Sequence, residues 1–569
     1  MPINRANILN SWGLAATFLL LGFSFMSFDL MALLTNGTTS LLNVRINDGM
    51  RIDESYMYIA GVGKTILFDP YIKEHASHLT LRPTIPTLIF SLIYLLCGSN
   101  LDLAIIVAHT VPPLVSCALI YLICMELCRN RALAILGILL AVGHFVYTPL
   151  TMIGSIYGKL LLGVVGPDLY ILKHLFGNYT PYGGVHSPTQ FTRLFSPALT
   201  LPFLLAPLLL VLKSSSPRLR GFLTALNLYV YPHNVIVLVL MEALFLLKNR
   251  GSQIASVVVF FILGAIPYIF QHGIVMYSGN YSDIYSRVGQ THDLSTLWFF
   301  VPLFGFFSLI AFLMRTFINK EKTQNVLFSL GIFLSALIVF FADTYTKFPQ
   351  IHLVELRIFA FLAPMALVSI FGMMDLKPSR VTIWIKSILI SINVYLLALI
   401  MASYIHSGWT HRMAYQDFPA DGFPSELAHL PKGAVVLTDV QYEIPYISAA
   451  SDKFSYLGYG IVSAAGNQEL IERLVIASRI FNWSDKRLKG NDWDELLSAP
   501  HWVYHHGTPS QNIIDSDFNL ASDRLKKISK CDLLKIYQVD YIRYREHPPN
   551  GVEECTKSYS NHLLEVSGR

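Results

Sequence analysis

The feature that most constrains this chain is a series of long apolar segments separated by short basic loops. A helix needs about 20 apolar residues to cross a bilayer, and many runs before residue 406 approach that length. Residues 221–247 are interrupted by Tyr231-Pro232-His233-Asn234, which favours two short helices in that run. Counting this pair, we predict about eleven crossings. The other predicted spans are residues 12–34, 101–128, 132–150, 197–212, 253–271, 295–316, 326–343, 355–373 and 381–405.

The end of the chain has a different composition. The sequence is 53% hydrophobic and 14% charged, whereas soluble domains carry about 25% charged residues. This deficit is concentrated before residue 406, and residues 406–569 resemble a globular domain in composition. The sequence therefore predicts a mainly α-helical membrane domain over 1–405 and a smaller α/β domain over 406–569. Strands are predicted at 435–438, 502–504 and 536–544, and helices at 442–450 and 467–481.

The basic clusters predict the orientation. With the N-terminus inside, every predicted cytoplasmic loop is basic, as the positive-inside rule requires. An odd number of crossings then puts residues 406–569 outside. Segment 84–96 is too short to span comfortably and is predicted to lie along the interface or to re-enter. We expect a multi-pass protein of a bacterial inner membrane with its site on the periplasmic side, where Cys531 and Cys555 can form a disulfide.

The first predicted outer loop contains an acidic pair in the sequence Arg51-Ile52-Asp53-Glu54-Ser55-Tyr56. One interpretation is structural, because two carboxylates before a helical stretch at 55–64 would stabilise its N-terminus. The other is catalytic, because a carboxylate at the membrane surface can take the proton of an attacking hydroxyl. The dipeptide alone does not separate these interpretations.

The pattern Arg-x-Asp-Glu-x-Tyr after a first membrane helix resembles the first-loop signature of the GT-C superfamily. These integral membrane glycosyltransferases use polyprenyl-phosphate or polyprenyl-diphosphate sugars. The resemblance continues through the Pro-containing stretch 82–96, the basic sequence at 128–131 and the short helix pair around 229–234. It implies transfer of a sugar from a polyprenyl-phosphate donor to a lipid-linked or cell-envelope glycan on the outer face.

The same resemblance implies that Asp53 is the general base, with Asp48 of the same loop as the second choice. Glu54 would orient it, bind a sugar hydroxyl or cap the helix. The superfamily has members with and without a required divalent ion, so the sequence leaves the metal open. A departing lipid phosphate needs a cation in a water-poor site. Candidates on the predicted outer side are Lys64, Arg82, Arg193, Arg287 and Arg357. Residues predicted to contact the substrates are Tyr56, His186, His233, His352 and Glu355.

Two other functions stay open. A transporter that flips a lipid-linked saccharide usually has internal repeats and mid-membrane charges, but the sequence shows no repeat and its notable charges fall in outer loops. A non-enzymatic scaffold or sensor leaves the long polar loops 35–100 and 151–196 unexplained. The net charge of +5 lies in topology clusters and does not indicate nucleic-acid binding. The expected partners are the lipid-linked donor, a glycan or glycolipid acceptor and membrane lipid, with the C-terminal domain as a scaffold or lid.

Overall fold

The computed structural model describes part of the chain and divides it into two compact units. Unit 1 comprises residues 1–37, 105–267 and 291–417, and unit 2 comprises residues 38–104, 268–290 and 418–569. The predicted boundary at residue 405 differs from this division, because unit 2 includes the first predicted outer loop. The described residues are 5–36, 41, 68–79, 84–144, 191–192, 197–249, 253–277, 283, 323–341, 357–373, 380–410, 425–439, 443–449, 452–458, 463–483, 511–545, 547–560 and 562–567.

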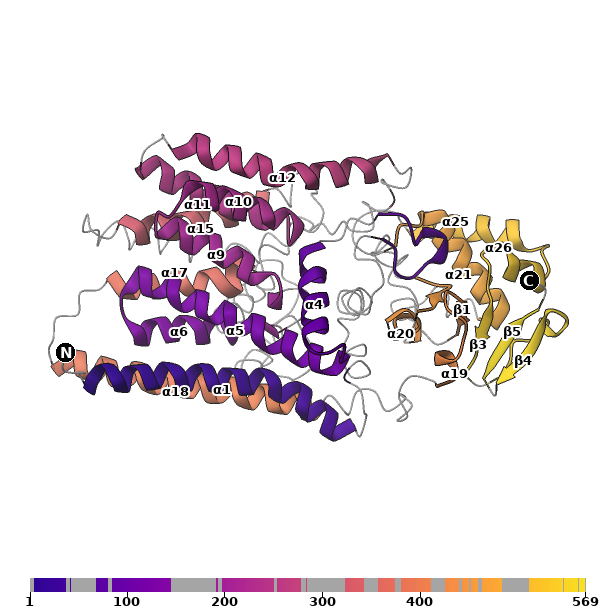
Figure 1. Ribbon diagram of the computed structural model, residues 1–569, viewed down its shortest axis with the longest axis horizontal. Coiled ribbons are helices and arrows are strands. Elements are labelled where there is room, and N and C mark those ends of the chain that lie inside the picture. The colour runs from indigo at the N-terminus through magenta and orange to yellow at the C-terminus, as the bar shows by residue number, and fades with distance from the viewer. Residues whose placement is uncertain are drawn as a thin grey trace, which may run out of the picture. The chain divides into compact units, whose positions relative to one another are not determined.

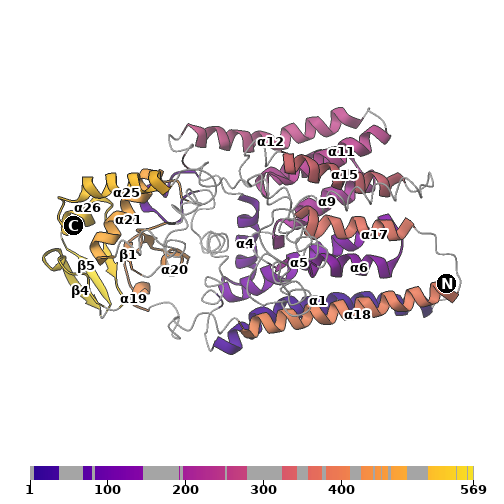
Figure 2. The same cartoon turned by 180° about the vertical axis from the view of Figure 1, so that it is seen from behind.

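Unit 1 is built from helices. Figures 1 and 2 both show α1 and α18 side by side along their length. Gly408 permits this approach, since a Cβ atom there would lie 2.7 Å from the carbonyl oxygen of Phe28. The helices lying wholly or mainly in unit 1 are α1 (Arg5–Asn36), α5 (Leu101–Cys128), α6 (Arg131–Val142), α9 (Leu201–Leu212), α10 (Pro217–Leu226), η4 (Asn227–Tyr229), α11 (Asn234–Asn249), α12 (Ile254–Met276), α15 (Thr323–Phe341), η9 (Ile358–Leu362), α17 (Ala363–Met373) and α18 (Arg380–Thr410).

Four helices in the described part of the chain are long and apolar enough to cross a membrane. They are Trp12–Thr35, Leu101–Cys128, Ile254–Met276 and Trp384–Trp409. Only 11% of the most apolar stretch of Trp384–Trp409 is buried in the protein. Exposing so large an apolar surface to water would be unfavourable, whereas lipid would cover it. The protein is therefore an integral membrane protein. The four helices agree with predicted spans, but the predicted total of about eleven is not confirmed.

The shorter apolar helices also follow the predicted pattern. The described elements confirm the predicted break at 231–234, where η4 ends before α11 begins. Segment 84–96 forms the helix α4 (Thr84–Leu96), as its predicted interfacial or re-entrant character allows. The predicted span 295–316 lies outside the described residues.

Unit 2 contains a small mixed sheet in the order β2-β1-β3-β5-β4. Strand β1 pairs in parallel with β2 and β3, whereas β5 pairs antiparallel with β3 and β4. Val436, Tyr541 and Leu563 contribute to the buried core beside this sheet. The other elements of unit 2 are η1 (Lys73–His75), α4, α19 (Ser425–Ala428), β1 (Val435–Thr438), α20 (Glu443–Ala449), β2 (Phe454–Ser455), α21 (Asn467–Phe481), α25 (Gln511–Leu525), α26 (Lys530–Ile536), β3 (Tyr541–Arg543), η11 (Glu553–Cys555), β4 (Thr556–Ser560) and β5 (Leu563–Val566).

The sequence predicted much of unit 2 correctly. The predicted strand at 435–438 and the helices at 442–450 and 467–481 match β1, α20 and α21. The predicted strand at 536–544 is wrong at its start, because Ser529 accepts a hydrogen bond from the Asp532 N–H and so caps helix α26. Cys531 and Cys555 form a disulfide. Residues 502–504 lie outside the described chain.

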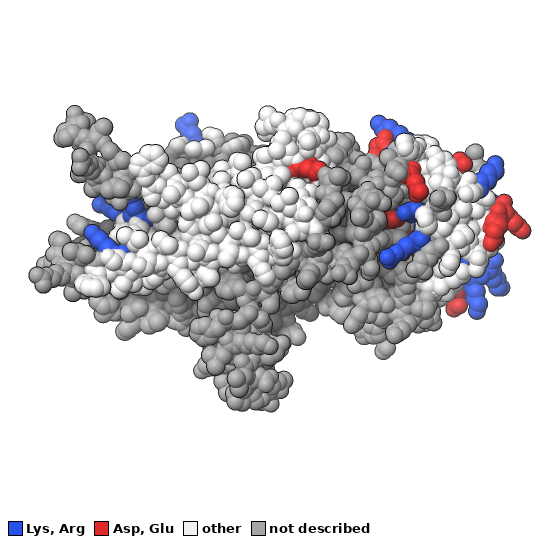
Figure 3. All heavy atoms as spheres, turned by 90° about the horizontal axis from the view of Figure 1, so that it is seen from below, with Lys and Arg blue, Asp and Glu red and all other residues white. Residues whose placement is uncertain are grey.

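The two units also differ in surface charge. The space-filling view in Figure 3 shows Lys, Arg, Asp and Glu side chains gathered over unit 2, while the visible face of the helical unit is mostly uncharged. This contrast is the one expected between a surface in water and a surface in lipid.

Candidate functional site

Two of the predicted site residues, His233 and Arg357, fall in the described part of the chain. Both belong to unit 1, where Arg357 directly precedes η9 and His233 lies in the break before α11. The remaining candidates lie outside the described residues, and their predicted roles stay predictions. They are Asp53, Glu54, Tyr56, Lys64, Arg82, His186, Arg193, Arg287, His352 and Glu355.

The guanidinium of Arg357 is buried and held from several elements. The side chain is 2% exposed. One terminal nitrogen donates to Asn234 Oδ1 at 2.9 Å, and the other donates to Thr200 Oγ1 at 2.7 Å. The guanidinium carbon lies 3.7 Å from the ring centroid of Tyr231, an arrangement typical of cation–π attraction. These contacts fix the guanidinium in position.

The broken helix pair supplies most of these partners. Asn227 donates its amide hydrogens to the carbonyls of Phe203 and Leu223 at 2.9 and 3.0 Å. The Phe203 carbonyl has no helical donor because residue i+4 is Pro207, and Leu223 lies in the last turn of α10. Its amide oxygen accepts from Asn234 at 3.0 Å. The amide chain therefore connects the Arg357 site to α9 and α10. The Tyr-Pro-His-Asn interruption is the sequence signal for this polar cluster.

Two predicted site residues, His233 and Arg357, both contact Tyr231, which the sequence analysis did not assign to the site. The ring of His233 lies 5.4 Å from that of Tyr231, centroid to centroid, and Tyr231 also carries the guanidinium of Arg357 on its face. The segment after Arg357 is a π-helical turn, Ile358–Leu362, and such turns often occur at functional sites. We call Arg357, Asn234, Thr200, Tyr231 and His233 the arginine cluster.

The arginine cluster has the chemistry of an anion site. A guanidinium presents a rigid fork of donors that matches phosphate oxygens. Asn234 and Thr200 are neutral acceptors, so these two partners orient Arg357 without cancelling its charge. In a water-poor region, such a preorganised cation stabilises developing negative charge strongly.

A second buried polar pair joins two predicted spans. His109 Nδ1 in α5 lies 3.1 Å from Asp29 Oδ2 in α1, and both side chains are fully buried. Ionisable groups inside membrane helices are costly unless they are paired. The pair therefore links α1 to α5. The sequence analysis missed it, although each residue is a polar group within a predicted apolar span.

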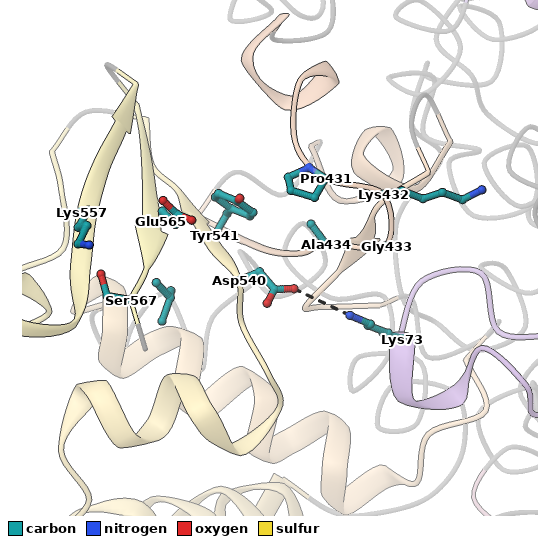
Figure 4. Close-up of a pocket in the computed structure, with 11 residues that line it drawn as sticks. Lys73, Pro431, Lys432, Gly433, Ala434, Asp540, Tyr541, Lys557, Glu565 and Ser567 are labelled. Atoms are coloured by element: carbon teal, nitrogen blue, oxygen red, sulfur yellow. Dashed lines mark ion pairs between the residues drawn. The ribbon is translucent and has the colours of Figure 1, made fainter. Parts of the chain in front are cut away.

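Unit 2 contains a cavity of about 370 Å³ beside its sheet. Figure 4 shows Lys73 approaching Asp540, with Nζ to Oδ2 at 4.0 Å, while Lys432 extends away from Tyr541. The cavity lies where β1 and β3 begin, whereas open α/β sheets usually bind ligands where parallel strands end. None of the predicted site residues is among its lining residues. This cavity is therefore not the candidate site.

The described residues offer little support for a metal centre. Within the ranges that the structure describes, no group of three or more His, Cys, Asp or Glu side chains is arranged to hold a metal ion.

No protein-family model and no curated protein matches this sequence. Among solved structures, the archaeal oligosaccharyltransferase AglB from Archaeoglobus fulgidus, in complex with an inhibitory peptide and a dolichol-phosphate, is similar over 93% of this chain and 69% of its own. The sequence identity is 10% and the TM-score is 0.36.

Two further structures of the Archaeoglobus fulgidus oligosaccharyltransferase are similar over 91% of this chain and 69% of theirs, each with a TM-score of 0.31. One is the apo form, at 11% identity, and the other is tethered to an acceptor peptide containing the NVT sequon, at 12% identity.

Proposed function

We propose that this protein is a membrane glycosyltransferase that moves a sugar from a polyprenyl-phosphate donor to a lipid-linked or cell-envelope glycan on the outer face. The observation that carries the proposal is the Arg-x-Asp-Glu-x-Tyr sequence at 51–56, in the loop that follows the spanning helix α1. A loop in this place can meet a donor whose lipid stays in the bilayer while its sugar projects into water.

Asp53 is the general base in this proposal. It takes the proton of the acceptor hydroxyl as that oxygen bonds to the anomeric carbon, and the bond from this carbon to the phosphate oxygen breaks. The bonding electrons leave with the lipid phosphate, and the configuration at the anomeric carbon inverts. Glu54 and Tyr56 belong to the same loop and are proposed to orient the base and the sugar.

The arginine cluster supports the other half of the reaction. Arg357 is buried, and two neutral acceptors hold it, at 2.9 and 2.7 Å. We assign it to the leaving phosphate, with His233 as a neighbouring substrate contact. Arg193, Lys64, Arg82 and Arg287 stay candidates for further phosphate contacts, and His186, His352 and Glu355 for contacts to the sugar or the acceptor.

The direct test uses the purified protein in lipid nanodiscs with undecaprenyl phosphate carrying a radiolabelled hexose. An extracted glycolipid fraction serves as acceptor, and labelled product and free undecaprenyl phosphate are both measured. Asp53→Asn should lower transfer by about 100-fold or more, the contribution of a positioned base. Asp48→Asn makes the same change in the same loop and should leave the rate nearly unaltered.

The same assay separates the enzyme from its rivals. A flippase moves the intact donor and releases no free lipid phosphate, and a scaffold changes neither quantity. Full transfer by Asp53→Asn would remove this mechanism.

A further inference from the structure

The first outer loop is held on both sides of Asp53 by residues of unit 2, which includes the first turn of α5 up to Ala104. On the N-terminal side, the backbone N–H of Leu41 donates to Asp102 Oδ1 at 2.7 Å, in the first turn of α5. On the C-terminal side, residues 68–79 close into a small loop through a bridge between Phe68 and Leu79. The intervening residues, 42–67, carry the whole acidic motif. Two fixed points therefore bracket the candidate base in the sequence.

Asp69 is the main attachment of the segment 68–79. Asp69 is only 1% exposed. Oδ1 accepts from the N–H groups of Tyr71 and Ile72 at 2.9 and 3.0 Å. Oδ2 accepts from Ser463 Oγ at 2.6 Å and from the Ala464 N–H at 2.8 Å. The carboxylate thus shapes its own loop with one oxygen and joins it to the segment before α21 with the other.

Only a carboxylate fits this position. Both oxygens accept two hydrogen bonds each, and an amide has one oxygen only. Asparagine would therefore turn an N–H₂ group toward two donors, and buried donors without acceptors are costly. The geometry is specific for aspartate.

Helix α21 provides a second set of contacts to the same segment. His75 Nε2 lies 2.7 Å from Glu469 Oε2. Glu74 accepts from the buried Arg473 at 2.9 Å, and Arg473 also contacts Glu469. A Cβ atom at Gly458 would lie 3.2 Å from the Cβ of Tyr71, so the two backbones pack closely. These polar and packing contacts together hold residues 68–79 in one position against α21 and Gly458.

The N-terminus of α21 is also contacted by a residue from the segment 268–290 of unit 2. Asp283 accepts a hydrogen bond from the Asn467 N–H at 2.9 Å. A carboxylate at this end of a helix is favoured by the helix dipole. Helix α21 is thus the element of unit 2 on which separate segments of the chain meet.

We propose that residues 68–79 form a latch that fixes the first outer loop on unit 2, with Asp69 as a positioning residue for the reaction at Asp53. This inference rests on the proposed function of Asp53. Small misplacements of a catalytic group reduce rates strongly, so anchoring both ends of its loop has a catalytic purpose. The C-terminal domain is then a working part of the site, beyond the scaffold or lid that its sequence suggested.

The docked geometry can be tested without any activity. Tyr71→Cys and Gly458→Cys together place two Cβ atoms about as close as a disulfide requires. In the full chain, with a protease site inserted within 411–424, mild oxidation should keep the cleaved pieces joined on a non-reducing gel. Each single cysteine variant is the control and should separate. Failure of the double variant to join would overturn the latch.

The positioning role is tested by Asp69→Asn in the transfer assay. We expect kcat to fall about tenfold or more, with the KM for undecaprenyl-phosphate hexose nearly unchanged. The control is Asp452→Asn, the same change at an exposed aspartate of unit 2. In the contacts that the structure gives, the Asp452 side chain pairs with its neighbour Lys453, at 2.6 Å, so this variant should keep the kcat of the wild type. If Asp69→Asn does not fold, Ser463→Ala replaces it in the test, because it removes one hydrogen-bond donor to Asp69. The kcat of Ser463→Ala should fall severalfold.

A rescue experiment separates positioning from folding. Adding the Tyr71→Cys and Gly458→Cys pair to Asp69→Asn and oxidising it should restore most of kcat, because a covalent bond replaces the lost hydrogen bonds. Unchanged kcat per folded molecule in both Asp69→Asn and Ser463→Ala would overturn the positioning role. If Asp53→Asn is fully active, the proposed function fails, while cross-linking still decides whether the latch exists.

Discussion

Arg357 of unit 1 and Arg473 of unit 2 are both almost completely buried, and different groups contact them. In unit 2, Arg473 is 1% exposed and contacts the carboxylates of Glu74 and Glu469. In unit 1, Arg357 is 2% exposed and donates to the neutral groups of Asn234 and Thr200. Both also lie over tyrosine rings. Two carboxylates thus contact Arg473, whereas two neutral acceptors contact Arg357.

The difference indicates different roles. The charge of Arg473 is matched by two carboxylates, so its contacts hold the latch and α21 together. Asn234 and Thr200 are neutral, so these two acceptors orient the guanidinium of Arg357 without contributing a negative charge, as suits the phosphate contact that we propose for it. Breaking each arrangement should therefore have separate consequences, one for the stability of unit 2 and one for transfer.

The largest effect is expected for Arg473→Met. Removing one partner of a buried ion pair leaves uncompensated charge and costs about 3–5 kcal/mol. The free energy of opening of α21, from amide hydrogen exchange in detergent micelles, should fall by about this amount. Exchange in α15 of unit 1 is the internal control. An unchanged α21 would contradict the role that we assign to the carboxylates.

The disulfide gives the next largest effect. Cys531 and Cys555 are separated by 24 residues, and closing such a loop contributes about 3 kcal/mol, mainly by restricting the unfolded chain. Cys531→Ser with Cys555→Ser should lower the unfolding midpoint of unit 2 in denaturant. The buried thiols Cys117 and Cys124 of unit 1 are free. Cys117→Ala should therefore leave the transition of unit 2 in place.

Arg357→Gln should act on catalysis and leave unit 2 intact. Loss of a preorganised donor to a developing anion costs about 100-fold in kcat, which corresponds to about 2.7 kcal/mol. Arg357→Lys keeps the charge but loses the fork geometry, and should recover only part of the rate. Wild-type kcat in Arg357→Gln would exclude this residue from the phosphate site.

The smallest effect is a pH dependence of the latch. Burial lowers the pKa of His75, and the charge of Arg473 lowers it further. The hydrogen bond and charge of Glu469, together with the charge of Asp69, outweigh both and raise the pKa above the ordinary value of 6.5. A raised pKa in the folded state stabilises the latch most below about pH 6.5, and this contribution is lost as pH rises through the folded-state pKa.

Hydrogen exchange at η1 and α21, compared at pH 6 and pH 8 after correction for intrinsic exchange, measures this dependence. The protection should decrease toward pH 8, and His75→Gln should reduce the decrease. Burial raises the pKa of Glu469, but His75 and Arg473 outweigh this and lower it, so the contribution of Glu469 is lost only in acid. A latch equally protected at both pH values would contradict the contribution of His75.

The sequence determined the membrane character and most local elements of this protein. The apolar runs gave four spanning helices that the structure describes, and the residue pattern of 467–481 matched α21. These features are local, because hydrophobic length and periodicity act within one segment. The strand predicted at 536–544 began too early, since Ile536 is the last residue of α26, the helix that Ser529 caps and in which Leu533 and Leu534 are buried, and the strand β3 covers only Tyr541–Arg543.

The tertiary structure alone decided which polar groups meet. Arg357 and Thr200 are far apart in sequence, as are Asp69 and Ser463, yet each pair forms a short hydrogen bond. A buried polar group must find a partner wherever the fold supplies one, and no periodicity encodes that choice. The sequence therefore indicated the acidic loop and the basic candidates, whereas only the folded chain revealed the arginine cluster and the latch.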